Sequence, residues 1–363
     1  MPTFSAGIIG LPNAGKSTLF NALTRGNAEV ASFPFCTISP NVSQIFIPDP
    51  RLDKLVALIK PERVVPAWIE VVDVAGLIRG AHRGEGLGNE FLSRIRGVSL
   101  LVEVVRCFES SVPHPEGNID PVRDAETIKL ELIFSDLEII ERRLTRLNKL
   151  LKSKTNRTHQ QRFELLTGLK KILERGDFPR LYLSRDELEM AEEEGLLSVK
   201  PLIFVANIGE ESSSSLQAQK LRDFAEKERI GMVEICAQLE MELSQLGPEE
   251  EKSFREEMEV KNQNRAKLID LIAKELELVT FFTVTGGEEV RAWAVKRGTP
   301  AVEAAGKVHS DMKRGFIRAE VLPVEQLLKI GDWKKARSEG KMRLEGRDYQ
   351  VQDGDVIHFR FNV

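Results

Sequence analysis

A glycine-rich segment near the amino terminus constrains this chain most. Residues 10–18 read Gly-Leu-Pro-Asn-Ala-Gly-Lys-Ser-Thr, which matches the phosphate-binding-loop pattern of glycine, four residues, then Gly-Lys-Ser. This pattern needs a strand before it and a helix after it. The apolar run at 4–9 predicts the strand, and Leu19, Phe20 and Leu23 have the spacing of one helix face. The segment therefore predicts an α/β domain organised around a bound phosphate group.

Each residue type in this loop has a chemical task. The glycines let backbone N–H groups close around phosphate oxygens, and those groups lie at the positive end of the following helix. The pattern predicts that Lys16 reaches the β- and γ-phosphates and that the Ser17 hydroxyl binds Mg²⁺. The alternative is a glycine-rich turn that carries a surface lysine. The predicted phosphate-binding residues are Asn13, Ala14, Gly15, Lys16, Ser17 and Thr18.

Length and composition limit the class of protein. With 363 residues the chain is long enough for two or three domains and a substantial core. No apolar run approaches the ~20 residues that span a bilayer, and the amino terminus lacks a signal-peptide pattern. The three cysteines are odd in number and far apart, so neither a disulfide framework nor a zinc site is indicated. We therefore expect a cytoplasmic protein that makes no contact with membranes.

Charge is distributed unevenly along the chain, although the net charge is only -4. Residues 141–171 carry ten lysines and arginines against two glutamates, whereas residues 234–260 carry nine glutamates against two basic residues. A local basic surface within an acidic protein is compatible with a nucleic-acid partner. The alternative for such a charge run is a solvated helix face.

A second motif follows a β-rich run at residues 68–72. Asp73 comes at the carboxyl end of this strand and begins a sharp turn that reaches Gly76, which is where open α/β sheets place Mg²⁺ and phosphate ligands. We expect Asp73 to hold Mg²⁺ through a water molecule. The glycine-rich segment that continues to Phe91 is either a connector or a switch, and its attachment to Asp73 favours the switch. Thr37, in a proline-punctuated segment, would complete the Mg²⁺ shell as a further switch residue; the alternative is an ordinary loop threonine.

The hydrophobic period then changes to that of a helix pair. Apolar residues at 133–151 alternate steps of four and three, and a polar tip at 152–161 separates them from a second apolar helix at 166–173. Ser184 and Glu187 have the spacing of a capping box and predict the start of a short third helix. These patterns predict an antiparallel helical hairpin inserted into the sheet domain.

The sheet domain and the last part of the chain differ in their strand patterns. Apolar runs at 97–105 and 202–206 predict buried parallel strands, whereas short alternating strands and one helix at 301–308 follow from about residue 280. The expected late strands are 281–284, 290–295, 316–321, 349–351 and 356–361. The predicted fold class is α/β: a P-loop sheet domain with an inserted α-helical hairpin and a C-terminal α+β domain. The expected domains are 1–125 with 197–279 for nucleotide binding, 126–196 for the hairpin, and 280–363 for the C-terminal domain.

Four motifs stand in the order expected of a switch-type nucleoside triphosphatase: the phosphate loop, Thr37, Asp73 to Gly76, and Asn207 to Glu210. Together with the hairpin and the C-terminal domain, they make the whole chain resemble the Obg-like ATPases of the bacterial YchF type. This resemblance implies an enzyme that hydrolyses ATP with Mg²⁺ and acts as a ribosome-associated switch. The most specific pieces are residues 10–18, 34–37 and 73–91, Asn207-x-x-Glu210, and residues 349–363, which are similar to the family's TGS domain, a β-grasp.

The base-recognition motif departs from the GTPase pattern. GTPases usually carry Asn-Lys-x-Asp, whose Asp carboxylate accepts from two N–H donors on the edge of guanine, whereas this chain has Ile208 and Glu210 in those places. Strict selection of guanine is therefore weakened, and the family resemblance implies a preference for ATP with some use of GTP. We predict Asn207 and Glu210 as base-binding residues; a strand-end turn with a capping asparagine is the alternative.

Hydrolysis needs a group that places the attacking water. Many switch enzymes use a glutamine directly after the Asp-x-x-Gly turn, but here that position is Leu77, which cannot orient water. The family resemblance points to His114 as the catalytic residue, in the loop after the strand at 97–105. On the residues alone, a histidine between two prolines is more often structural. The resemblance further implies that Asn13 helps to bind a monovalent cation such as K⁺.

Ribosomal RNA is the partner that we expect besides ATP, and we expect a monomer. TGS domains recur in translation-associated proteins, and basic residues there and at the hairpin tip would contact phosphates. The alternative function is a nucleotide-gated ribosome- or RNA-binding module with incidental hydrolysis, which Leu77 keeps open; a GTP-specific translation factor is a third option. The basic residues are Lys149, Lys152, Lys154 and Arg157 at the tip, and Lys307, Lys313, Arg314, Arg318, Lys334, Lys335 and Arg337 in the C-terminal domain.

Overall fold

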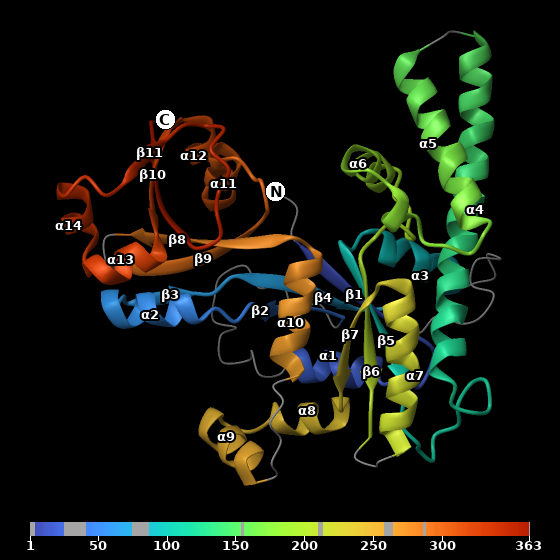
Figure 1. Cartoon of the computed structure of the whole chain (residues 1–363). Helices are drawn as coiled ribbons and strands as arrows, with labels where there is room; N and C mark the ends of the chain where they lie inside the picture. Colours follow the sequence, from blue (N-terminus) through green and yellow to red (C-terminus); the bar gives the residue numbers. More distant parts are fainter. Residues whose placement is uncertain are drawn as a thin grey trace. The chain divides into compact units, whose positions relative to one another are not determined.

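The chain folds into two compact units (Figure 1). The larger unit comprises Ser5–Ser43 and Val71–Arg265, and the smaller comprises Met1–Phe4, Gln44–Glu70 and Ala266–Val363. No helix in the described part of the chain is both long and apolar enough to cross a membrane. The structure is a computed structural model that describes residues 4–24, 41–74, 87–153, 156–209, 213–257, 264–285 and 288–362.

A sheet with parallel central strands organises the larger unit, as predicted. Strands β1, β5, β6 and β7 each pair in parallel with the next, for example through Ile8 opposite Val102. Every residue of β5 and β6 is buried, which is typical of strands covered on both faces. The strand order is β2 (Val42–Phe46), β4 (Trp68–Asp73), β1 (Ser5–Ile9), β5 (Leu100–Arg106), β6 (Leu202–Asn207) and β7 (Gly231–Ile235).

A hydrophobic core lies on one face of this sheet. Its strand residues alternate along the chain, as Leu101 and Val105 do in β5, and therefore point to the same side. Three helices contribute to this core: α3 (Leu87–Arg96), the first turns of α4 (Pro121–Ser153) and α7 (Ser213–Glu228). The helix that follows the phosphate loop, α1 (Lys16–Thr24), packs against α8 (Ala237–Leu243), and α9 (Pro248–Glu257) comes next in the chain.

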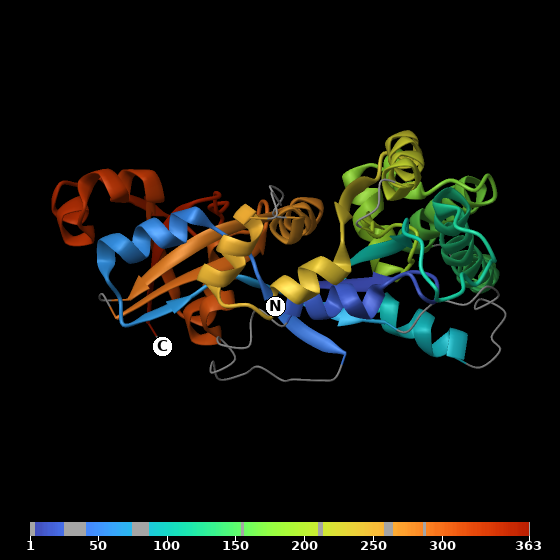
Figure 2. The same cartoon turned by 90° about the horizontal axis from the view of Figure 1, so that it is seen from below.

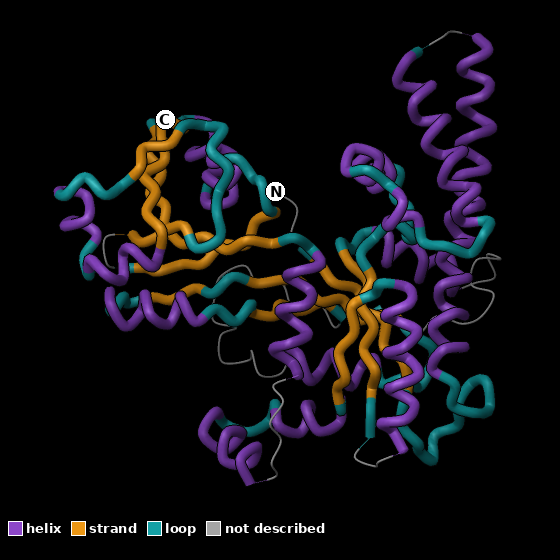
Figure 3. Tube along the Cα trace, viewed as in Figure 1, coloured by secondary structure: helices purple, strands orange, loops and turns teal. Residues whose placement is uncertain are grey.

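The predicted helical hairpin is present. The long helix α4 has 33 residues, and α5 (Arg157–Leu173) packs against it (Figure 3). Ile133 and Ile140 of the predicted seam are buried in one cluster with leucines of α5, which confirms the seam. The predicted capping box of Ser184 and Glu187 is confirmed at the start of α6 (Arg185–Glu193), which follows the 3₁₀ helix η3 (Pro179–Tyr182).

A second, mixed sheet organises the smaller unit (Figure 2). The core of this unit includes Phe281, Trp293 and Phe359. The strand order is β11 (Arg343–Glu345), β10 (Phe316–Pro323), β12 (Asp355–Phe361), β8 (Leu278–Thr285), β9 (Glu289–Lys296) and β3 (Arg63–Val65). The predicted helix at 301–308 is confirmed. The remaining helices are α2 (Pro50–Ile59), α10 (Asn264–Glu275), α11 (Ala301–Val308), α12 (Ser310–Arg314), α13 (Val324–Ile330) and α14 (Trp333–Ser338).

One feature of the smaller unit differs from the sequence-based expectation. The strand expected at 349–351 is wrong, because only an isolated bridge joins Gln350 to Pro300. The Asp355 carboxylate accepts hydrogen bonds from the Tyr349 hydroxyl and the Gln352 N–H, and this holds the segment in a turn. Residues 44–70 group with the C-terminal residues, because β3 pairs with β9. The expected boundaries of three domains stay a prediction.

A buried carboxylate ties α4 to the segment that precedes β6. Asp136 is fully buried, and its two oxygens accept hydrogen bonds from the N–H groups of Leu197 at 3.0 Å and Ser198 at 2.7 Å. Arg96 lies against the same carboxylate, with Nη1 3.4 Å from Oδ1. Burial raises the pKa of Asp136, while the two backbone hydrogen bonds and Arg96 oppose this rise. Asp136 therefore anchors the base of the hairpin.

We expect Asp136→Ala to lower the free energy of unfolding by about 3 kcal/mol, because two buried N–H groups and Arg96 lose their acceptor. Urea unfolding followed by circular dichroism measures this change. Glu138→Ala is the control at an exposed position on the same helix, where the change should stay below ~0.5 kcal/mol. An effect of Asp136→Ala as small as that of the control would contradict the anchoring role.

Candidate nucleotide-binding site

The phosphate loop connects β1 to α1 through backbone conformations that favour glycine. Gly10 has φ +145° and Gly15 has φ +94°, where residues with a side chain are strained. A Cβ atom at Gly10 would collide with the Val104 carbonyl oxygen, and one at Gly15 would collide with the Asn207 side-chain nitrogen. The two motif glycines are therefore required by close approach to β5 and β6.

Lys16 is buried beneath the loop. Its ammonium group donates to the Leu11 carbonyl oxygen at 2.8 Å, so the side chain folds back along the loop. Burial lowers the pKa of Lys16 to about 8, and the nearby charge of Asp73 opposes this shift. A buried cation with one carbonyl partner is suited to bind an anion, because an anion would restore the charged form.

Ser17 and Asp73 bring two oxygen ligands together. The Ser17 hydroxyl, at the start of α1, donates to Asp73 Oδ2, at the end of β4, at 2.8 Å. Mg²⁺ is usually held by one or two protein oxygens together with phosphate oxygens and waters, which fits this pair. Within the described ranges, no group of three or more histidine, cysteine or carboxylate side chains could hold a metal ion. The donor set suits a Mg²⁺ ion that arrives with a phosphate ligand.

Asn207 braces the phosphate loop from the end of β6. Its Nδ2 donates to the Ala14 carbonyl oxygen at 2.9 Å, and its Oδ1 accepts from the Ala237 N–H, at the start of α8, at 3.1 Å. The side chain is buried and its polar atoms are used in these contacts. Ile208 continues the chain with its N–H donating to the Ile235 carbonyl oxygen at 2.9 Å. Asn207 thus fixes the loop relative to the end of β6 and the start of α8.

His114 lies in the loop after β5 and is buried, with 8% of its surface exposed. Its Nε2 is 2.8 Å from Asp124 Oδ2, in the first turn of α4, and its Nδ1 accepts from the Glu116 N–H at 3.1 Å. Asn13 of the phosphate loop donates from its amide to the Pro113 carbonyl oxygen at 3.2 Å. The structure therefore brings the histidine loop against the phosphate loop.

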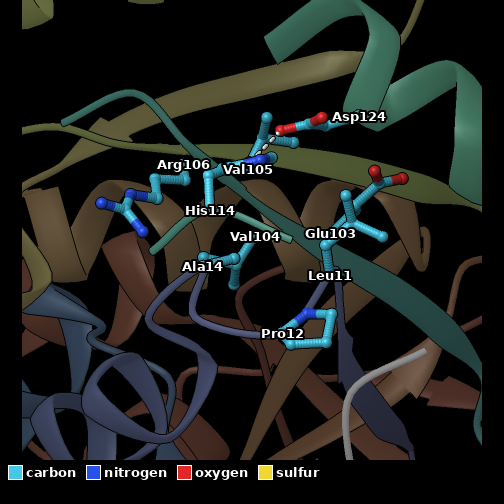
Figure 4. Close-up of a pocket in the computed structure, with 9 residues that line it drawn as sticks. All are labelled: Leu11, Pro12, Ala14, Glu103, Val104, Val105, Arg106, His114 and Asp124. Carbon is cyan, nitrogen blue, oxygen red and sulfur yellow. Dashed lines mark hydrogen bonds and ion pairs between the residues drawn. The ribbon is translucent and has the colours of Figure 1, made fainter. Parts of the chain in front are cut away.

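A small pocket separates these two loops (Figure 4). Two charged residues of β5 lie beside it: Glu103 is 1% exposed and Arg106 is 3% exposed. Glu103 Oε2 and Arg106 Nη1 have no hydrogen-bond partner among the described residues. Burial raises the pKa of Glu103 well above 4.5, and the charge of Asp124 adds to this rise. The lining residues are Leu11, Pro12, Ala14, Glu103, Val104, Val105, Arg106, His114 and Asp124.

Sequence reasoning found some of these residues and missed others. It missed Glu103, Arg106 and Asp124, although charged residues inside an otherwise apolar strand were an available signal for the first two. Thr37, Gly76, Glu210 and Leu77 lie outside the described residues. The predicted residues that the structure places along this edge of the sheet are Asn13, Ala14, Gly15, Lys16, Ser17, Thr18, Asp73, His114 and Asn207.

Nucleoside triphosphate binding is the chemistry that this edge of the sheet can perform. The loop precedes the start of a helix, where backbone N–H groups favour an anion, with a buried lysine beneath it and an oxygen pair that suits Mg²⁺ beside it. These features lie at the carboxyl ends of parallel strands, where open α/β sheets bind ligands. The larger unit is therefore a P-loop nucleotide-binding domain.

Comparisons with known proteins agree with this class. A family model described as "50S ribosome-binding GTPase" matches residues 5–140, and a YchF GTPase C-terminal model, described as "Protein of unknown function (DUF933)", matches residues 278–362. The chain is 45% identical over 365 residues to "Ribosome-binding ATPase YchF" of Bacillus subtilis, and 41% identical over 362 residues to that of Escherichia coli O157:H7. Each alignment covers 99% of both chains. The chain belongs to the YchF family.

A solved structure supports the same family. The fold matches "Structure of the Schizosaccharomyces pombe YchF GTPase" with a TM-score of 0.88 and 31% sequence identity. This match covers 99% of the present chain and 98% of the yeast chain. The predicted fold class and the predicted family are therefore both confirmed.

The buried carboxyl group of Glu103 should make the stability of the protein depend on pH. Its raised pKa means that the folded chain keeps a proton that the unfolded chain loses above about pH 4.5, so stability falls as the pH rises. Glutamine cannot ionise, so we expect Glu103→Gln to be more stable than wild type at about pH 8, with a smaller difference at about pH 5. Urea midpoints of both proteins at the two pH values measure this. A difference independent of pH would contradict a protonated Glu103.

Proposed function

We propose that this protein is a ribosome-associated switch that binds and hydrolyses ATP, accepts some GTP, and uses Mg²⁺. The observation that carries the proposal is the Ser17–Asp73 pair beside the buried Lys16 of a P-loop. Full-length relatives with 41% to 45% identity are named ribosome-binding ATPases, and this supports the same activity here. The products of the proposed reaction are ADP and phosphate.

In this proposal, the triphosphate replaces contacts that the loop makes with itself. Lys16 exchanges the Leu11 carbonyl oxygen for the β- and γ-phosphate oxygens, and the new contact is charge-assisted and stronger. Ser17 would bind Mg²⁺ directly, Asp73 would hold it through a water molecule, and Thr37 would complete the shell. Bound Mg²⁺ supplies neutralising charge at the β- and γ-phosphates. Gly76 belongs to the switch segment that would respond to the γ-phosphate.

We assign the placing of the attacking water to His114, as the family resemblance implies, because Leu77 stands where many switch enzymes have a glutamine and cannot orient water. His114 lines the same pocket as Leu11 and Ala14 of the phosphate loop, which supports the assignment. Asn13, which contacts the histidine loop through Pro113, is the proposed ligand of a K⁺ ion. A K⁺ ion there would add positive charge near the phosphates.

Base recognition is assigned to Asn207 and Glu210. Both polar atoms of the Asn207 side chain hold the phosphate loop and α8, so its contribution is to fix the edge from which the base is read. Glu210 supplies the only carboxylate in the Asn-Ile-Gly-Glu motif. Without the lysine and aspartate of the GTPase motif, strict selection of guanine is weakened, which agrees with a preference for ATP and some use of GTP.

Two exposed basic surfaces support an RNA partner. Lys149, Lys152 and Arg157 are exposed at the ends of α4 and α5, and Arg318 and Lys334 are exposed on the smaller unit. Phosphate contacts from such residues would make ribosome binding fall with salt. Lys313, Arg314, Lys335 and Arg337 are exposed as well but lie in ion pairs, and Lys307 is partly buried over the Phe4 ring. We further infer a cytoplasmic monomer that does not contact membranes.

A nucleotide-gated ribosome- or RNA-binding module is the second candidate function. The observation that favours it is the state of His114, whose two ring nitrogens are both occupied by the Glu116 N–H and the Asp124 carboxylate. In that function ATP acts as an allosteric ligand, and its hydrolysis is incidental.

We expect wild-type protein to release phosphate from ATP faster than from GTP, slowly when alone, at roughly 10⁻⁴ to 10⁻² s⁻¹, and faster with ribosomes. His114→Ala should still bind ATP but lose about 10²-fold in turnover, because the attacking water is no longer placed. The measurement is Mg²⁺-dependent phosphate release. His159→Ala on α5 is the control and should keep the rate measured without ribosomes.

Wild-type turnover in His114→Ala would refute the catalytic role of His114. ATP binding without turnover under any condition would instead favour the nucleotide-gated module.

Base selection has its own test. Ile208→Lys combined with Glu210→Asp restores the GTPase motif, so we expect the ratio of ATP affinity to GTP affinity to fall. Titration with both nucleotides measures this ratio, and Ile208→Val, which keeps an apolar side chain, is the control. An unchanged ratio in the double variant would remove the base-binding role of these positions.

A further inference from the structure

We propose that Asp124 is a positioning residue for His114: it keeps the proton on Nε2, so that Nδ1 is the nitrogen that accepts from the attacking water. This inference rests on the proposed function, because it assigns a partner to the proposed catalytic residue. It follows from the contacts around the pocket between the phosphate loop and β5 (Figure 4).

Asp124 carries the negative charge of the two carboxyl groups at this pocket, because among the described residues it alone has a guanidinium partner. Its Oδ1 accepts from Arg123 Nη2 at 2.9 Å and from Arg123 Nε at 3.2 Å, and its Oδ2 lies 2.8 Å from His114 Nε2. The other carboxyl group at the pocket, Glu103, has one oxygen without a partner among the described residues. Of the two neighbouring acids, the one with a guanidinium partner ionises and the other keeps its proton.

Both ring contacts of His114 require the same tautomer. A carboxylate can only accept, so the bond to Asp124 requires a proton on Nε2. The Glu116 N–H can only donate, so Nδ1 must carry a lone pair. Asp124 therefore selects the neutral imidazole whose Nδ1 is a hydrogen-bond acceptor.

The hydrogen bond from the Glu116 N–H to Nδ1 is the contact that opens when water enters. The bond to Asp124 is charge-assisted and 2.8 Å long, whereas the bond from the Glu116 N–H is neutral and 3.1 Å long. The weaker bond belongs to a tight turn in which the Gly117 N–H donates to the His114 carbonyl oxygen at 3.0 Å. A change in this turn frees Nδ1 while Asp124 retains the ring, so the lone pair becomes available to water.

The resulting step balances without a further reagent. The water donates one hydrogen bond to Nδ1 while its oxygen forms a bond to the γ-phosphorus. The bond from that phosphorus to the bridging oxygen breaks, and ADP leaves with the electron pair. One water proton stays on the attacking oxygen and the other moves to a second oxygen of the γ-phosphoryl group, so the product is dihydrogen phosphate. His114 orients the water and ends the reaction in its starting tautomer.

Asp124 also lies on α4, the helix that forms one arm of the hairpin. It belongs to the first turn of α4, and Arg123 beside it donates to the Asn118 carbonyl oxygen at 2.7 Å and to the Asn118 side chain at 2.9 Å. The start of α4 thus holds the histidine loop at two places. The other end of the same helix carries the exposed lysines at the hairpin tip.

The tautomer of His114 can be observed directly in the full-length wild-type protein. With ¹⁵N-labelled histidine, two-bond ¹H–¹⁵N spectra distinguish a protonated Nε2 from a protonated Nδ1, and His114→Ala identifies the signals. We expect the proton on Nε2 at neutral pH. A proton on Nδ1 would overturn the proposal, whether or not any variant at position 124 folds.

The matching variant is Asp124→Asn. Arg123 offers only donors, so it holds the amide oxygen of the new side chain and turns the amide N–H₂ toward Nε2, which moves the ring proton to Nδ1. We expect the ¹⁵N spectrum to show this change and kcat for ATP to fall roughly 10²-fold, with the Kd for ATP unchanged. Asp120→Asn is the control at the start of the same helix. The Asp120 side chain accepts from the Arg123 backbone N–H at 3.2 Å, and an asparagine can accept the same hydrogen bond, so kcat of this variant should stay within about twofold of wild type.

Two further outcomes separate the positioning role of Asp124 from the proposed ATPase function. An Asp124→Asn protein that keeps the wild-type kcat, or that loses ATP affinity in proportion to activity, would overturn the positioning role. A wild-type protein that never hydrolyses ATP would overturn the proposed function, while the ¹⁵N spectrum would still decide the tautomer.

Discussion

The contact between Asn207 and the backbone of the phosphate loop is the interaction on which the candidate site depends. It joins the end of β6 to the Ala14 carbonyl oxygen and, through the Ala237 N–H, to the start of α8. The contact is possible only because Gly15 has no Cβ atom at the point of approach. One asparagine therefore fixes the phosphate loop relative to the carboxyl end of β6 and the start of α8.

Burial of charge is the second property that shapes this site. Lys16, Glu103 and Asp124 all lie in surroundings that disfavour their charged forms, and each responds according to its partners. Lys16 retains a carbonyl acceptor and Asp124 an arginine, whereas Glu103 has neither at Oε2 among the described residues. Buried charged groups with few partners are typical of ligand-binding sites, because a bound ligand supplies the missing charge.

Local patterns predicted the parts of the structure that depend on neighbours in the sequence. The P-loop, the seam of α4 and the capping box of Ser184 all follow from short spacings, and the structure contains each of them. The pairing of β3 with β9 could not be predicted, because three residues carry no pattern that names a partner far away in the chain. The pair of His114 and Asp124 was missed for a similar reason, since its geometry depends on how α4 begins over the end of β5.

In the proposed switch, the bound nucleotide controls association with the ribosome, and sedimentation of the full chain with ribosomes measures this control. We expect different amounts of bound protein with a slowly hydrolysed ATP analogue and with ADP, and binding that weakens as salt is raised from about 50 to 200 mM. Equal binding in both nucleotide states, unchanged by salt, would contradict it.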